Sequence, residues 1–128
     1  MTKIISLRLP TESLKDYNYV ACVVTAWKNW SIKSGVKFVL LNSDQGDFKD
    51  ILNLRYGTDS RIVIVDADDL VSWNATPETV FGSPKIVEIL AKTPTKTIER
   101  IIRDNVIVRF LDVGSIPSIW SRISPNYL

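Results

Sequence analysis

The stretch that decides the fold is Arg61-Ile-Val-Ile-Val-Asp66-Ala-Asp-Asp69. Four consecutive β-branched residues, 62–65, predict a strand that is covered on both faces, which is typical of parallel sheets. The strand runs directly into three carboxylates. In open α/β sheets, ligands bind at the carboxyl ends of the strands. This stretch therefore predicts both a central strand and a candidate site.

Two earlier segments predict further strands. The run Val36-Lys-Phe-Val-Leu-Leu41 is almost continuously apolar, and residues 3–9 alternate between apolar and polar until Pro10 ends the pattern. Apolar residues at helical spacing predict a main helix over about 13–31 and a short helix over about 48–56. Gly35 and Gly57 follow these segments as expected stops.

The second half of the chain uses one arrangement three times, a hydroxyl residue followed by proline: Thr76-Pro77, Ser83-Pro84 and Thr93-Pro94. Each is typical of a helix start, so we expect helices near 77–81, 84–92 and 95–104, with Ile86, Ile89 and Leu90 of the second one facing the core. A fourth strand is expected over 106–111 and a last helix over 116–123. The order predicts a single α/β domain over 1–128, Rossmann-like, with about four mostly parallel strands and helices on one or both faces.

Composition excludes several classes of function. The chain has 128 residues, 45% of them hydrophobic, a net charge of +2, one cysteine and no histidine. The missing histidine excludes His-dependent triads and His-ligated zinc, and the single Cys22 excludes an internal disulfide. The balanced charge disfavours nucleic acid as a partner. Neither a signal peptide nor a membrane span is expected, so we expect a cytoplasmic protein, of the host cell if the origin is viral, without a membrane partner.

The carboxylates Asp66, Asp68 and Asp69 form the strongest candidate metal site. Carboxylates this close together suit Mg²⁺ or Mn²⁺, hard cations that prefer oxygen ligands and often bring a substrate phosphate. The polar loop after the second strand is expected at the same sheet edge, where it would add the candidate ligand-binding residues Ser43, Asp44 and Asp47. The alternative is structural, because Asp is also common where it caps turns and helices.

The segment Ile62-Val-Ile-Val-Asp-Ala-Asp-Asp-Leu-Val-Ser-Trp73 resembles the acidic strand end of GT-A glycosyltransferases. In that family a DxD motif holds a divalent metal on a sugar nucleotide. The resemblance implies that Asp66 and Asp68 match the motif, with Asp68 as the principal metal ligand, and that a nucleotide or phosphate is the ligand. Trp73 is a candidate for stacking on such a ligand or for an interface, with core packing as the alternative.

A second resemblance lies at the N-terminus. Ile5-Ser-Leu-Arg-Leu-Pro10, followed by Thr11-Glu-Ser-Leu14, resembles the start of ribbon-helix-helix DNA-binding proteins. It implies that Ser6 and Arg8 would point into a DNA groove from a paired ribbon. The alternative is an ordinary first strand of the sheet.

The main helix is apolar around most of its circumference, which predicts burial on more than one side and motivates an expectation of self-association. No activated nucleophile or base can be named, so the sequence does not decide whether the chain is an enzyme. We expect a binding or assembly module that forms a homo-oligomer. The alternatives are a metal-dependent phosphate or nucleotide-sugar site and, second, DNA binding.

Overall fold

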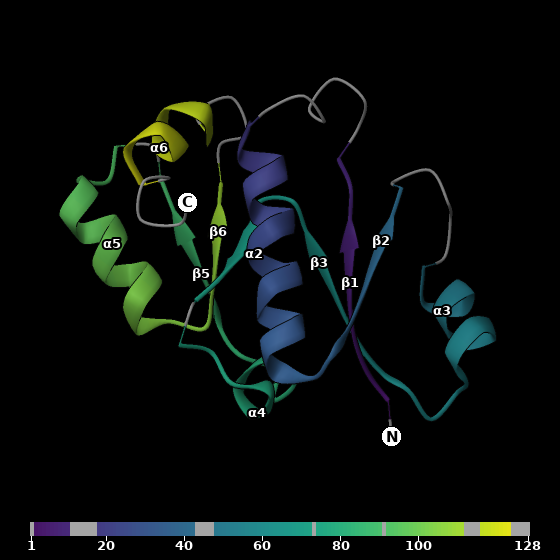
Figure 1. Cartoon of the computed structure of the whole chain (residues 1–128). Coiled ribbons are helices and arrows are strands. Elements are labelled where there is room, and N and C mark those ends of the chain that lie inside the picture. The colour runs from purple at the N-terminus through teal and green to yellow at the C-terminus, as the bar shows by residue number, and fades with distance from the viewer. Residues whose placement is uncertain are drawn as a thin grey trace.

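The computed structural model describes residues 2–10, 18–42, 48–72, 74–90, 92–111 and 116–123. Six strands and five helices lie in this part of the chain, and the strands form two small sheets (Figure 1). The mixed α/β class predicted from the sequence is confirmed. The expectation of about four mostly parallel strands is met only in part, because the strands divide into two sheets of three.

The first sheet contains β1 (Lys3–Arg8), β2 (Lys37–Leu41) and β3 (Arg61–Asp66), in the order β2-β1-β3 with all strands parallel. These are the first three strands predicted from the sequence. Ile5 is in register with Phe38 on one side and Val63 on the other. Since partners in a parallel ladder share a face, the register defines which residues each covering helix meets.

The two helices of this half lie on opposite faces of the first sheet. Helix α2 (Asn18–Ser34) packs on the face that carries Ile5, Leu7 and Val65, whereas α3 (Phe48–Tyr56) packs through Leu52 on the other face. The chain moves outward from β1 to β2 and then crosses to the opposite side of β1 to form β3. Right-handed crossovers require this placement of the helices. The direction of winding therefore reverses between β1 and β3.

Both glycines predicted as helix stops have the conformation that the role requires. Gly35, after α2, has φ of 69°, and Gly57, after α3, has φ of 94°. Residues with a Cβ rarely adopt this left-handed region, which favours glycine at helix ends.

The second sheet contains β4 (Asp69–Val71), β5 (Ile86–Ile89) and β6 (Ile107–Phe110), in the order β4-β6-β5. Strand β6 is parallel to β5 and antiparallel to β4. Helices α5 (Thr95–Asp104) and α6 (Ile116–Ile123) confirm the last two predicted helices. The rings of Phe110 and Trp120 meet edge-on at a centroid distance of 6.4 Å, so α6 covers β6.

The helix predicted near 84–92 is wrong, because β5 occupies this segment. The predicted core positions fail with it: Ile86 is 38% exposed and Leu90 57%, and only Ile89 is buried. Three of the four residues of β5 are β-branched, which favours a strand, and pairing with β6 supplies partners for its backbone groups. By contrast, Thr76 caps α4 (Pro77–Val80) as expected and forms a capping box with Thr79.

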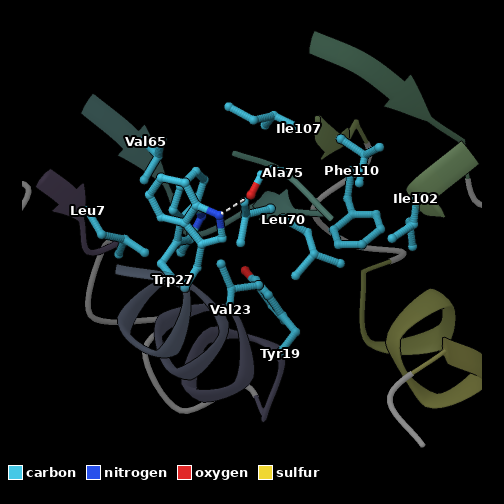
Figure 2. Close-up of a cluster of buried hydrophobic side chains, with 14 of the residues drawn as sticks. Leu7, Tyr19, Val23, Trp27, Val65, Leu70, Ala75, Ile102, Ile107 and Phe110 are labelled. Atoms are coloured by element: carbon cyan, nitrogen blue, oxygen red, sulfur yellow. Dashed lines mark hydrogen bonds between the residues drawn. The ribbon is translucent and has the colours of Figure 1, made fainter. Parts of the chain in front are cut away.

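Helix α2 joins the two sheets into one core (Figure 2). Trp27 and Trp30 are fully buried and contact each other edge-on. Trp27 Nε1 donates to the carbonyl of Asp69 at 2.8 Å, and Trp30 Nε1 donates to the carbonyl of Ala75 at 2.7 Å. Both acceptors lie in or just after β4, so the indoles attach the second sheet to the helix that covers the first. The fully buried residues of α2 all lie on one broad face of the helix, whereas Ala21, Thr25 and Lys28 on the opposite face are exposed. The prediction that α2 is buried on more than one side is therefore wrong.

None of the helices in the described ranges has both the length and the apolar character that crossing a bilayer demands.

Candidate functional site

The candidate site lies at the carboxyl ends of β1 and β3, where the winding of the first sheet reverses. Arg8 ends β1, Asp66 ends β3, and the two residues are register partners. Arg8 Nε donates to Asp66 Oδ1 at 2.8 Å, and both side chains are partly exposed. This hydrogen bond is the main cause that raises the pKa of Arg8. Reversal points of this kind are where doubly wound α/β sheets bind ligands.

Asp69 stands at the start of β4 and is almost fully buried. Arg109, its register partner on β6, donates Nε to Oδ1 at 2.7 Å and an Nη to Oδ2 at 3.1 Å. The same Oδ2 accepts the backbone N–H of Asp66 at 3.0 Å. Because three donors already use this carboxylate, Asp69 has the least capacity left for a metal and mainly fixes the end of β3 against the second sheet.

Asp68 differs from its neighbours because its Oδ1 is buried and has no hydrogen-bond partner among the described residues. Burial is the largest cause that raises the pKa of Asp68 to about 6, and the charges of Asp69 and Asp66 add to it. A buried carboxylate oxygen without a donor is costly when ionised. A cation beside it would remove that cost.

The three carboxylates are close enough to act together, since one oxygen from each can be chosen so that all lie within 4.8 Å of one another. Arg8 and Arg109 neutralise two of the three charges and leave one net negative charge in the cluster. This arrangement can offer carboxylate oxygens from Asp66 and Asp68 to a hard cation, while Arg8, at the exposed rim, can meet an anion.

The other residues predicted for a site fall into two groups. Ser43, Asp44, Asp47 and Trp73 lie outside the described residues. Ser6 is only 1% exposed in the central strand, and Arg8 is engaged with Asp66, so neither has the free groove-facing position that the DNA-binding alternative implies.

Arg109 is a residue of this cluster that the sequence patterns do not single out. Its signal is a guanidinium within the otherwise apolar run 106–111, since a charge inside a buried strand calls for a partner of opposite charge.

Comparison of the chain with protein-family models, with curated proteins and with solved structures gives no match.

Proposed function

We propose that this chain binds a divalent cation, Mg²⁺ or Mn²⁺, together with a phosphate-bearing ligand of the nucleotide-sugar class, at Asp66 and Asp68. The observation that carries the proposal is the buried Oδ1 of Asp68, which has no described donor and lies beside a second carboxylate at the reversal point between β1 and β3. The resemblance of residues 62–73 to the GT-A strand end supports the same two residues.

Each residue of the cluster has a distinct role in this proposal. Asp68 and Asp66 supply oxygen ligands to the cation. Arg8, with a side chain 44% exposed at the rim, offsets the charge of the phosphate. Asp69 and Arg109 do not touch the ligand; their bidentate pair holds Asp66 and the turn in position. The bound cation supplies charge neutralisation between the carboxylates and the phosphate.

The proposal is tested by calorimetric titration with Mn²⁺ alone, followed by UDP-glucose and GDP-mannose in the presence of Mn²⁺. We expect saturable Mn²⁺ binding, and nucleotide-sugar binding that requires Mn²⁺. In the double variant Asp66→Asn/Asp68→Asn both signals should disappear. The matched control is Asp104→Asn, which removes an exposed carboxylate on α5 and should change neither signal.

Two results reject the proposal. One is the absence of Mn²⁺ binding up to about 1 mM, which is the weakest affinity worth assigning to a specific site. The other is Mn²⁺ binding that persists unchanged in the double variant, because the cation would then be held elsewhere.

Self-association and DNA binding stay predictions from the sequence. Of the apolar residues of α2 that motivate self-association, Tyr19, Val23, Trp27 and Trp30 are buried within one chain. Ala21 is exposed, and Val24 and Ala26 are half-buried. Light scattering across a concentration series tests the oligomeric state. A salt-dependent gel shift that is lost in Arg8→Ala would be the signature of DNA binding.

A further inference from the structure

A cavity of about 300 Å³ lies between β3 and the second sheet. Its walls come from β3, from Asp69 at the start of β4, from the end of α4 and the following turn, and from β5 and β6. Most of them are apolar: Ile62, Ile64, Phe81, Pro84, Ile86 and Ile107. Ile64 and Ile86 are 42% and 38% exposed, so large aliphatic side chains face solvent inside this hollow. Its volume is at the lower end for ligand pockets and equals the liquid volume of about ten waters.

The outer backbone edge of β3 faces this cavity. β3 pairs with β1 only, among the strands of the described ranges. The N–H of Arg61 donates to Thr2 on the β1 side, whereas the N–H of Asp66 donates to Asp69 on the opposite side. Since backbone groups of a strand alternate in direction, Ile62 and Ile64 direct their N–H and C=O groups outward. Their backbone groups form no ladder hydrogen bond with a described strand.

One end of the cavity is basic. Arg61, at the start of β3, lines it and donates an Nη to the carbonyl of Phe81. Lys3, the register partner of Arg61, places its Nζ 5.7 Å from the centroid of the Phe81 ring. The lining carboxylate, Asp69, is already neutralised by Arg109. The charge of this end is therefore complementary to an acidic group.

We propose that the cavity accepts an extended peptide segment that adds as a strand to the outer edge of β3, with apolar side chains in the hollow and an acidic group toward Arg61 and Lys3. An extended peptide fits all three observations, because it offers alternating backbone groups to Ile62 and Ile64, places side chains at strand spacing, and can carry the complementary charge. Asp69 lines this cavity but supplies no cation ligand in the proposed function, so either proposal can fail without the other.

The first experiment needs no ligand and uses amide hydrogen exchange resolved by NMR. The amides of Val63 and Val65, which face β1, should exchange slowly, whereas those of Ile62 and Ile64 should exchange at least about tenfold faster in the free protein. Equal protection at every protein concentration means that the chain itself covers the edge. Protection that grows with concentration means that a second copy does. Either result overturns the proposal.

The second experiment measures binding of two synthetic peptides in which valine and threonine alternate, one with an N-terminal and one with a C-terminal aspartate. We expect one of them to bind and to slow exchange at Ile62 and Ile64. Replacing its aspartate by asparagine should weaken binding. Two further peptides carry N-methyl groups on every second amide, one on the odd-numbered residues and one on the even-numbered residues. Only one of these sets of amides would face β3, so one peptide should lose binding and the other should keep it. If both peptides bind equally well or equally poorly, the cavity selects apolar bulk rather than a strand.

Matched variants locate the site. Ile64→Ser should weaken peptide binding by at least about fivefold, because an aliphatic contact in the hollow is lost. Leu54→Ser makes the same chemical change at a side chain that is 90% exposed on α3 and should have no effect. If neither peptide binds up to about 1 mM, or if both variants bind equally, the proposal is wrong.

Discussion

The two sheets of this molecule use different principles of construction. The first sheet is entirely parallel and lies between α2 and α3, and its middle strand β1 is buried from Ile4 to Leu7. The second sheet mixes a parallel with an antiparallel pair, and its β4 has only three residues. The first sheet places Arg8 and Asp66 at a shared edge. The second sheet supplies the pair Asp69–Arg109 that holds this edge in place.

The candidate site therefore depends on the junction between the sheets more than on either sheet alone. Two kinds of contact form that junction. The indoles of α2 donate hydrogen bonds to the carbonyls of Asp69 in β4 and of Ala75 after β4. The carboxylate of Asp69 accepts the backbone N–H of Asp66 at the end of β3.

The largest loss of stability, measured as the free energy of unfolding, is expected for Trp27→Ala. The side chain is fully buried and its Nε1–H is bonded to Asp69. Truncation of a buried tryptophan costs about 3–5 kcal/mol. Ile32→Ala, on the same helix but at a position 71% exposed, should stay within about 0.5 kcal/mol of the parent. Urea unfolding of both variants measures the difference. A loss below about 1 kcal/mol in Trp27→Ala would show that α2 does not hold the two sheets together.

The next effect is expected for Asp69→Ala. Removing one partner of a buried ion pair leaves the other without compensation, and we expect a loss of about 3 kcal/mol, the low end of the usual range, because the Arg109 side chain keeps 35% exposure. The carboxylate also loses its bond to the N–H of Asp66, so Mn²⁺ binding should weaken as well. Denaturant unfolding and Mn²⁺ titration of one preparation measure both. Unchanged Mn²⁺ affinity in a destabilised variant would contradict the positioning role.

The strands that sequence patterns miss both belong to the second sheet: β6 is predicted, whereas β4 and β5 are not. Strands β1, β2 and β3 are foreseen because each has enough alternating or continuous apolar residues to define a period. β5 is missed because Ile86, Ile89 and Leu90 fit helical spacing as well as a strand, and the preceding Ser83-Pro84 resembles a helix start. Only pairing with β6, which lies far along the chain, decides the outcome.

The candidate site is foreseen to a similar extent. Asp66, Asp68 and Asp69 are found because they follow an apolar strand, but the sequence does not distinguish their roles. Asp69 is engaged with Arg109 of the second sheet, whereas Oδ1 of Asp68 has no hydrogen-bond partner among the described residues. Contacts at a sequence separation of 40 leave no local pattern, so the pairing of these charges could not be predicted.

A smaller change in stability, and a gain rather than a loss, is expected for Asp68→Asn. Burial raises the pKa of Asp68 to about 6, above its ordinary value of 3.8, so the folded state binds a proton more tightly than the unfolded state does. The contribution of this carboxyl group to the free energy of unfolding is fully favourable below about pH 4 and is lost as the pH rises through about 6. Asparagine carries no charge at any of these pH values, so the variant avoids the loss. It should be more stable than the parent by about 1 kcal/mol at pH 7, a figure discounted for partial solvation.

The pH dependence checks the cause. Unfolding in urea at pH 4 and pH 7 should show that the advantage of Asp68→Asn is present at pH 7 and nearly absent at pH 4. The same variant should lose Mn²⁺ binding, because stability and binding make opposite demands on this carboxylate. An advantage of equal size at both pH values would mean that it does not arise from the charge of Asp68.

The smallest change in stability is expected for Arg8→Ala. The side chains of Arg8 and Asp66 remain 44% and 34% exposed, and pairs this exposed contribute about 0–1 kcal/mol. Binding should respond more sharply and in two directions. Loss of the guanidinium releases Oδ1 of Asp66, so Mn²⁺ alone should bind at least as tightly as before. The nucleotide sugar, which loses a cationic partner for its phosphates, should bind about tenfold more weakly.

Arg103→Ala, which removes an exposed arginine paired with Asp104 on α5, should alter neither affinity. If both affinities fall together in Arg8→Ala, Arg8 organises the carboxylates rather than meeting the anion. The exposed rim of the first sheet would then have the same positioning role as the buried pair in the second.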